Sequence, residues 1–96
     1  MTMFNKHWGI NVLQNGYVNI YCPTIHKDGV NGIGDKREIY KELKSLESYL
    51  AESGFKGWVS WTELINVHIM KFFTKIKAYP YGIDLKKETI WFKKEF

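Results

Sequence analysis

The chain has 96 residues, with 14 Lys and Arg against 10 Asp and Glu, and a net charge of +4. This length allows one domain, residues 1–96, and excludes a second. No window approaches the apolar run of a membrane span, and the single Cys22 excludes an intramolecular disulfide. The N-terminal residues lack a signal-peptide pattern, so we expect a soluble protein in the cytoplasm, the host cytoplasm if the source is viral.

Two strands joined at Asn15-Gly16 open the predicted fold. The segments HWGINVLQ and YVNIYCPT flank this dipeptide, which is typical of tight β-hairpin turns. In the second segment Val18, Ile20 and Cys22 fall on one face, and Pro23 ends regular pairing. We expect an antiparallel hairpin with one buried face, on which Cys22 is an inert thiol.

A glycine-rich loop, GVNGIG at Gly29–Gly34, leads from this hairpin into an amphipathic helix. Asp35 is placed to cap the helix and Gly54 to end it. The apolar residues between them recur at helical spacing: Ile39, Leu43, Leu46 and Leu50. Backbone N–H groups of such a loop and of the first helical turn can bind phosphate. The pattern predicts either a corner for a nucleotide-like ligand or a plain connection between strand and helix.

The remaining elements complete an α+β domain. The segment KGWVSWT predicts a strand that is covered on both faces and runs parallel to the strand Tyr17–Thr24. Asn66 then caps a second helix, and YPYGIDL and TIWFKKEF predict a closing hairpin. The expected order is ββαβαββ, a mixed sheet with a central parallel strand pair and two helices. The apolar side of the second helix carries Ile69, Phe72, Phe73 and Ile76.

The C-terminal third carries most of the positive charge. A lysine surplus can attract a polyanion through counterion release, but a modest one is more often a solvated face. We therefore do not expect nucleic acid as the partner. The lysines concerned are Lys71, Lys75, Lys77, Lys86, Lys87, Lys93 and Lys94.

From Tyr17 to Phe96 the chain resembles the core of the GNAT acyltransferases. In that family a strand ends near a proline, a glycine-containing loop leads into a helix, and an Asn-led helix follows the next strand. The family's first strand and first two helices have no counterpart here, so the chain is similar to small GNAT-like proteins encoded by bacteriophages. The matching residues are Pro23, Gly32, Ile33, Gly34, Asn66, Phe72 and Lys75.

This resemblance implies an acyl-CoA-dependent N-acetyltransferase that acts on an unknown amine. Acetyl-CoA would be the cofactor, with its pantetheine arm in the cleft where the two parallel strands part. Its pyrophosphate would lie on the backbone of the loop. The implied cofactor-binding residues are Val30, Asn31, Gly32, Ile33, Gly34, Asp35 and Asn66.

Acetyl transfer needs a base for the amine and an acid for the leaving thiolate. The family commonly places a tyrosine acid on the second helix, where this chain has Phe73. Tyr79 and Tyr81 follow closely and are the candidate acids, and His26 is the candidate base. A positioned water is an alternative base.

The same departures favour a second hypothesis, a catalytically inactive GNAT-fold binding protein of viral origin. The Arg or Gln that opens the family's loop motif has no clear counterpart either. Such a protein would dock on a protein partner through exposed aromatic side chains. The candidate docking residues are Trp8, Tyr79, Tyr81 and Trp91.

Other chemistries find less support in the sequence. The three histidines and one cysteine show no recognisable metal-ligand spacing, so no metal site is predicted. The G-x-x-x-x-G-K-[ST] motif of P-loop NTPases is absent. The GVNGIG run also fails the spacing of a dinucleotide-binding turn.

Overall fold

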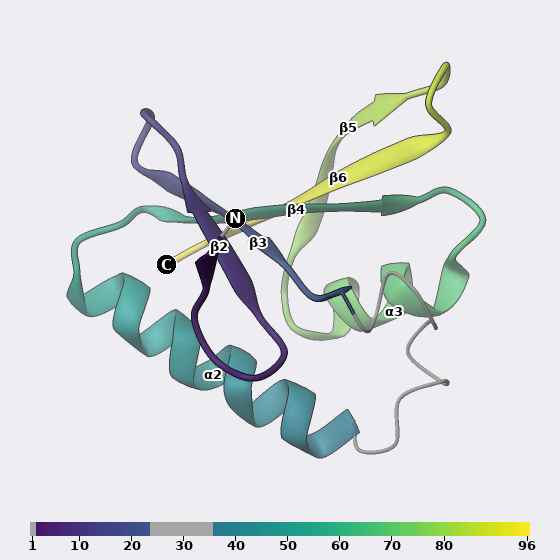
Figure 1. Ribbon diagram of the computed structural model, residues 1–96. Helices are drawn as coiled ribbons and strands as arrows, with labels where there is room; N and C mark the ends of the chain where they lie inside the picture. The colour runs from purple at the N-terminus through teal and green to yellow at the C-terminus, as the bar shows by residue number, and fades with distance from the viewer. Residues whose placement is uncertain (1, 24–35) are drawn as a thin grey trace.

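Six strands and two helices make up the part of the chain that the computed structural model describes, residues 2–23 and 36–96 (Figure 1). The strands form one mixed sheet in the order β1-β2-β3-β4-β6-β5. The expected α+β class, with a mixed sheet and two helices, is thereby confirmed. The elements are β1 (Thr2–Met3), β2 (Gly9–Val12), β3 (Tyr17–Tyr21), α2 (Lys36–Glu52), β4 (Gly57–Glu63), α3 (Val67–Lys75), β5 (Tyr79–Asp84) and β6 (Thr89–Glu95).

The strand pairing follows the sequence-based prediction, with one addition. Strands β3 and β4 are parallel, and β2 with β3 and β5 with β6 are antiparallel hairpins. The addition is β1, which pairs with β2 through Thr2↔Ile10 and Met3↔Gly9. The predicted order ββαβαββ lacks this strand because two residues are too few to show an alternating pattern.

The turn between β2 and β3 is built on Asn15-Gly16, as predicted. Gly16 has φ +89°, a left-handed conformation that glycine adopts without strain. The side-chain oxygen of Asn15 accepts a hydrogen bond from the backbone N–H of Tyr17 at 3.1 Å. The N–H of Leu13 donates to the carbonyl oxygen of Tyr17 at 3.0 Å, which closes the hairpin.

The helix ends also match their sequence signals. Gly54 has φ +88°, and Phe55 N–H donates back to the carbonyl oxygen of Leu50 at 3.1 Å, the pattern of a glycine-terminated helix. Asn66 caps α3 by accepting a hydrogen bond from Ile69 N–H at 3.3 Å. The predicted cap of α2, Asp35, lies outside the described residues. Neither described helix is long and apolar enough to cross a membrane.

Both helices pack on the same face of the sheet (Figure 1). From α2, Glu47 accepts a hydrogen bond from Trp58 Nε1 of β4. From α3, the Phe73 ring lies 5.8 Å from the Trp58 ring and 5.2 Å from the Phe92 ring of β6. The core therefore lies between one sheet face and the two helices. Its members include Val18, Ile20, Cys22, Ile39, Leu43, Leu46, Leu50, Ile69 and Ile76.

Strand β4 is covered on both faces from Gly57 to Ser60, as the sequence predicts. Among the described elements, no helix lies on the face that carries Val59 and Trp61. Val59 is nevertheless only 4% exposed, because it sits in register between Asn19 of β3 and Lys93 of β6. Side chains of the neighbouring strands therefore provide the cover on the face that carries no described helix.

The first residue of β4 must be glycine. A Cβ atom on Gly57 would lie 2.1 Å from the backbone carbonyl oxygen of Lys94, far inside contact distance. This close approach lets β4 and β6 pair along seven residue pairs, from Gly57↔Glu95 to Glu63↔Thr89. The central strand is thus firmly held on its β6 side.

Candidate functional site

The central parallel strands part after a short ladder. Their paired residues run only from Tyr17↔Gly57 to Asn19↔Val59, although β3 continues to Tyr21 and β4 to Glu63. Ser60 Oγ donates to the carbonyl oxygen of Ile20 at 2.9 Å, just past the last pair. We call the region beyond this bond the β3/β4 opening, formed by residues 20–21 and 60–63.

A buried hydroxyl without a partner lies on the β4 side of this opening. Thr62 is 1% exposed, and among the described residues its Oγ1 has no hydrogen-bond partner. The Oδ1 atom of Asn19, at the last ladder pair, is in the same condition. Buried polar atoms are normally hydrogen-bonded. Asn19 belongs to the face opposite the helices and Thr62 to the helix side, so these two atoms lie on opposite faces of the sheet.

A groove of about 950 Å³ runs between the start of α2 and the end of α3. Three of the lining residues are cationic, Arg37, Lys41 and Lys75, and Phe72 and Ile76 give it an apolar wall. Such a lining suits a ligand with both anionic and flat apolar parts. The described lining residues are Arg37, Glu38, Tyr40, Lys41, Phe72, Lys75 and Ile76.

Most of the predicted cofactor residues fall outside the described part of the chain. These are Val30, Asn31, Gly32, Ile33, Gly34 and Asp35, together with the candidate base His26. Asn66 is described, and its side-chain oxygen accepts the hydrogen bond that caps α3. The structure therefore gives Asn66 a local structural role at the N-terminus of α3.

The candidate acids Tyr79 and Tyr81 lie on the edge strand β5. Strand β6 separates β5 from β4, which puts both residues about two strand spacings, roughly 10 Å, from β4. Desolvation raises the pKa of Tyr81, and desolvation together with the Glu95 carboxylate raises the pKa of Tyr79. Both phenols therefore keep their protons at neutral pH, but neither stands at the β3/β4 opening.

An aromatic-rich surface covers the sheet face opposite the helices. The Tyr81 ring lies 6.4 Å from that of Trp91, and Lys93 Nζ lies 5.2 Å from the Tyr81 ring centre. A second, smaller hollow of about 260 Å³ includes Trp61 and Trp91 in its lining. We call this surface the open face, and its residues are Tyr17, Asn19, Tyr21, Trp61, Tyr79, Tyr81, Trp91 and Lys93.

Trp8 does not belong to any exposed surface, so its prediction as a docking residue is wrong. It is 1% exposed, and its Nε1 donates to the carbonyl oxygen of Ile39 in α2 at 3.0 Å. The indole fixes the loop between β1 and β2 onto the helix. The sequence does not reveal this contact, because the partner carbonyl lies 31 positions away.

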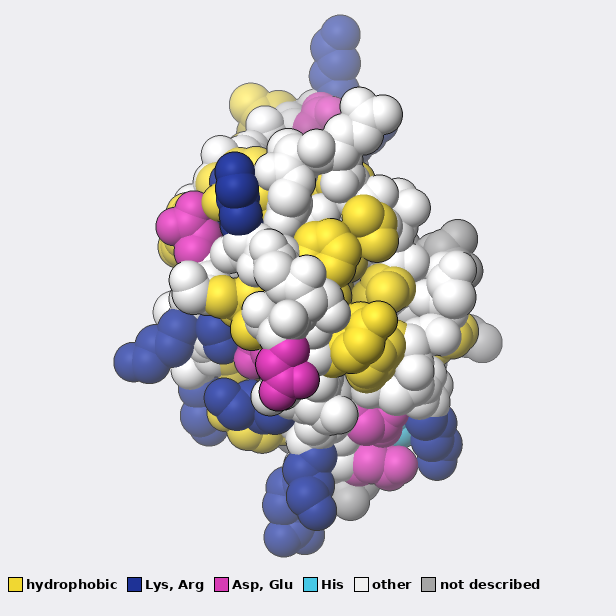
Figure 2. Space-filling view, turned by 90° about the vertical axis from the view of Figure 1, so that its left-hand side faces the viewer, with side chains coloured by type: hydrophobic (Ala, Val, Ile, Leu, Met, Phe, Trp, Pro, Cys, Tyr) yellow, Lys and Arg dark blue, Asp and Glu magenta, His cyan; other side chains and the backbone are white. Residues whose placement is uncertain are grey.

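The basic residues are spread over the surface rather than joined in one stripe on the side seen in Figure 2. Lys and Arg side chains stand around the edge of that side, and hydrophobic side chains gather near its middle. This side is the left-hand side of Figure 1. The groove cations, by contrast, converge on one hollow from two helices.

Comparison with known proteins adds no family to this description. No family model matches the chain, and no curated protein matches it. The functional proposals that follow are therefore argued from the residues and their geometry.

Proposed function

We propose that this chain is a GNAT-like domain that binds acyl-CoA and transfers the acetyl group to an amine. The β3/β4 opening carries the proposal, because the central parallel pair has only three ladder pairs and both strands continue beyond them. A pantetheine arm is narrow, extended and rich in amides, so it can bond to the backbone of strands on either side. The closing hairpin next to β4, in the order β4-β6-β5, also fits the resemblance.

The groove between α2 and α3 supplies a place for the nucleotide end of the cofactor. CoA carries a pyrophosphate and a 3′-phosphate, which Arg37, Lys41 and Lys75 can neutralise. The adenine ring can pack on the apolar wall formed by Phe72 and Ile76. One of these cations, Lys75, is also among the residues that carry the resemblance to the GNAT family.

The chemistry requires little from side chains. The amine attacks the thioester carbonyl, the carbon–sulfur bond breaks, and the CoA thiolate takes up a proton. Holding the two reactants in contact supplies much of the rate acceleration in such a transfer. A water molecule serves as the base for the amine, and the thiolate takes its proton from solvent, because Tyr79 and Tyr81 lie on β5, two strands away from the β3/β4 opening.

Isothermal titration with acetyl-CoA, CoA and dephospho-CoA tests the binding step. We expect binding in about the micromolar range, weakened roughly tenfold by Lys75→Glu or Arg37→Glu, which corresponds to about 1.4 kcal/mol. Dephospho-CoA should bind more weakly than CoA if the cations hold the 3′-phosphate. Lys86→Glu is the matched control, since this exposed lysine lies in the β5–β6 turn. No heat and no change in melting temperature with any of the three would refute the proposal.

An assay of CoA thiol release from acetyl-CoA then distinguishes an acetyltransferase from a protein that only binds the cofactor. The assay uses a panel of primary amines, including polyamines and lysine-containing peptides. Amine-dependent release above the rate without protein supports acetyl transfer. Tight CoA binding without release would leave a cofactor-binding protein that lacks the proposed activity.

The open face favours the second candidate function, docking on a protein partner. Tyr79 and Tyr81 are 43% and 48% exposed, and neighbouring aromatic side chains of this kind are enriched in protein interfaces. This proposal does not need the β3/β4 opening. Tyr81→Ala with Trp91→Ala would abolish partner binding while leaving CoA binding unchanged, and the groove variants would do the reverse.

A further inference from the structure

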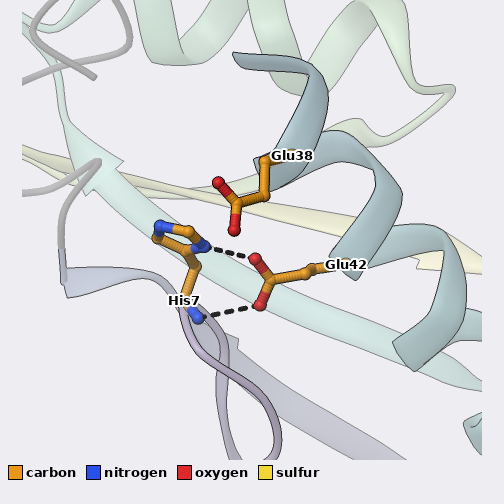
Figure 3. Close-up of side chains that lie close together, drawn as sticks. All are labelled: His7, Glu38 and Glu42. Carbon is orange, nitrogen blue, oxygen red and sulfur yellow. Dashed lines mark hydrogen bonds and ion pairs between the residues drawn. The ribbon is translucent and has the colours of Figure 1, made fainter. Parts of the chain in front are cut away.

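A histidine and two glutamates meet where the loop between β1 and β2 crosses α2 (Figure 3). Glu38 and Glu42 stand four residues apart on α2, so both project from the same side of the helix. One ligand atom from each of His7, Glu38 and Glu42 lies within 4.8 Å of the others. This His7/Glu38/Glu42 cluster is separate from the β3/β4 opening and from the open face, and it shares Glu38 with the groove between α2 and α3.

The cluster is held in place by hydrogen bonds outside its own side chains. Asn5 Nδ2 donates to the carbonyl oxygen of Glu42 at 3.1 Å, and Trp8 Nε1 donates to that of Ile39 at 3.0 Å. These two bonds flank His7 on both sides along the chain. The loop is therefore fixed on the helix whether or not the imidazole is present, and the ring is preorganised toward the carboxylates.

His7 and Glu42 are already in contact and mostly shielded from solvent. The His7 backbone N–H donates to Glu42 Oε1 at 3.0 Å, and His7 Nδ1 contacts Glu42 Oε2. Their side chains are 12% and 17% exposed. The Glu38 carboxylate, which is 45% exposed, points toward the same space and leaves one side open to water (Figure 3).

The charges favour a divalent cation in that space. A proton on His7 balances one carboxylate, whereas a doubly charged ion balances both. The Lys6 ammonium stands 3.7 Å from Glu38 Oε1, but its side chain is 73% exposed and can move into water at little cost. One imidazole nitrogen with two carboxylate oxygens is a donor set that Zn²⁺ accepts, with water in the fourth position.

We propose that His7, Glu38 and Glu42 form a binding site for a divalent transition-metal ion, with Zn²⁺ as the best match. Ligand atoms around tetrahedral zinc lie about 3.4 Å apart, for bonds of about 2.1 Å. To bind the ion, the contacting atoms His7 Nδ1 and Glu42 Oε2 must move apart, and the exposed Glu38 carboxylate must turn toward the same point. The bound ion would join the loop between β1 and β2 to the first half of α2. The proposal does not depend on acetyl-CoA binding.

Titration of tag-free protein with ZnCl₂ tests the site. We expect one Zn²⁺ per chain, a rise in melting temperature of a few degrees at saturating metal, and an affinity at least tenfold lower in each of His7→Ala, Glu38→Gln and Glu42→Gln. Gln at position 42 keeps an oxygen that can accept the His7 N–H. Circular dichroism confirms that each variant is folded.

His68→Ala and Glu52→Gln are the matched controls, because His68 is an exposed histidine on α3 and Glu52 an exposed glutamate on α2. Both should bind Zn²⁺ like the parent protein. The proposal is overturned by a dissociation constant above about 1 mM in the parent. It is equally overturned if Glu38→Gln, whose side chain is partly exposed, binds Zn²⁺ as tightly as the parent does.

Discussion

At the scale of single residues, Glu95 connects two tyrosines of the open face. Tyr17 Oη donates to Glu95 Oε1 at 2.8 Å, and this hydrogen bond is the main cause of the raised pKa of Tyr17. Desolvation and the same carboxylate raise the pKa of Tyr79. Both phenols therefore hold their protons more tightly in the folded chain than in the unfolded one.

This difference predicts a loss of stability in alkaline solution. A raised folded-state pKa contributes stability that is fully present below the unfolded value of about 10 and is lost as pH rises through the folded value. We expect the melting temperature of the parent protein to fall between about pH 9 and pH 11. Thermal unfolding followed by circular dichroism across that range measures the effect.

Glu95→Gln isolates the carboxylate in this prediction. Glutamine keeps an oxygen that can accept the hydrogen bond from the Tyr17 hydroxyl, but it removes the negative charge that opposes phenolate formation. The variant should show a smaller alkaline fall in melting temperature than the parent protein. Equal falls in the two proteins would contradict the role given to Glu95.

At the scale of elements, one buried carboxylate links α2 to two strands. Glu47 is 8% exposed and accepts hydrogen bonds from Trp58 Nε1 of β4 at 2.8 Å and from Lys94 Nζ of β6 at 2.9 Å. Removing one member of a buried ion pair leaves the other uncompensated, which costs about 3–5 kcal/mol. We expect Glu47→Ala to lower the free energy of unfolding by about that amount, as measured by urea denaturation.

Two further variants give this prediction its controls. Glu47→Gln keeps an acceptor for the Trp58 indole and loses only the charge beside Lys94, so its loss should be smaller. Glu52→Ala, at an exposed position near the end of the same helix, should change the stability by less than about 0.5 kcal/mol. Equal, small losses for both Glu47 variants would mean that the pair does not hold α2 on the sheet.

Local signals were sufficient to predict most elements. The Asn15-Gly16 turn, the Gly54 helix end and the Asn66 cap each depend on one or two residues, and the structure has all three. The functional sites depend on contacts between distant segments instead. His7 stands 35 positions from Glu42, and Lys75 is brought to Arg37 only by helix packing. The spacing of Glu38 and Glu42 on one helix face was the single local signal of the His7/Glu38/Glu42 cluster.

At the scale of the whole molecule, the two described helices form one layer on one side of the sheet. The buried side chains of β4 are Trp58, Ser60 and Thr62, which face the helices, and Val59, which lies on the opposite side of the sheet. The four consecutive residues from Gly57 to Ser60 are buried, in agreement with the predicted cover on both faces. The sequence does not reveal that side chains of neighbouring strands cover the face opposite the helices. Among the described elements, therefore, no helix covers the open face.

Replacement of Thr62 tests the stability of the fold and the proposed acetyl-CoA binding with the same variant. The buried Oγ1 of Thr62, which has no partner among the described residues, costs free energy in the unliganded protein. We expect Thr62→Val, which keeps the shape and removes the hydroxyl, to raise the free energy of unfolding by about 1 kcal/mol. If acetyl-CoA occupies the β3/β4 opening and bonds to this hydroxyl, the same variant should bind it several-fold more weakly.

Ser60→Ala should lower the free energy of unfolding by about 1 kcal/mol, in contrast to Thr62→Val. The reason is that Ser60 Oγ already donates a hydrogen bond to the carbonyl oxygen of Ile20. Urea denaturation and calorimetric titration with acetyl-CoA measure both effects on the same samples. A destabilised Thr62→Val would show that the hydroxyl has a partner in the folded chain. If Thr62→Val is more stable than the parent protein but binds acetyl-CoA equally tightly, acetyl-CoA does not bond to the Thr62 hydroxyl.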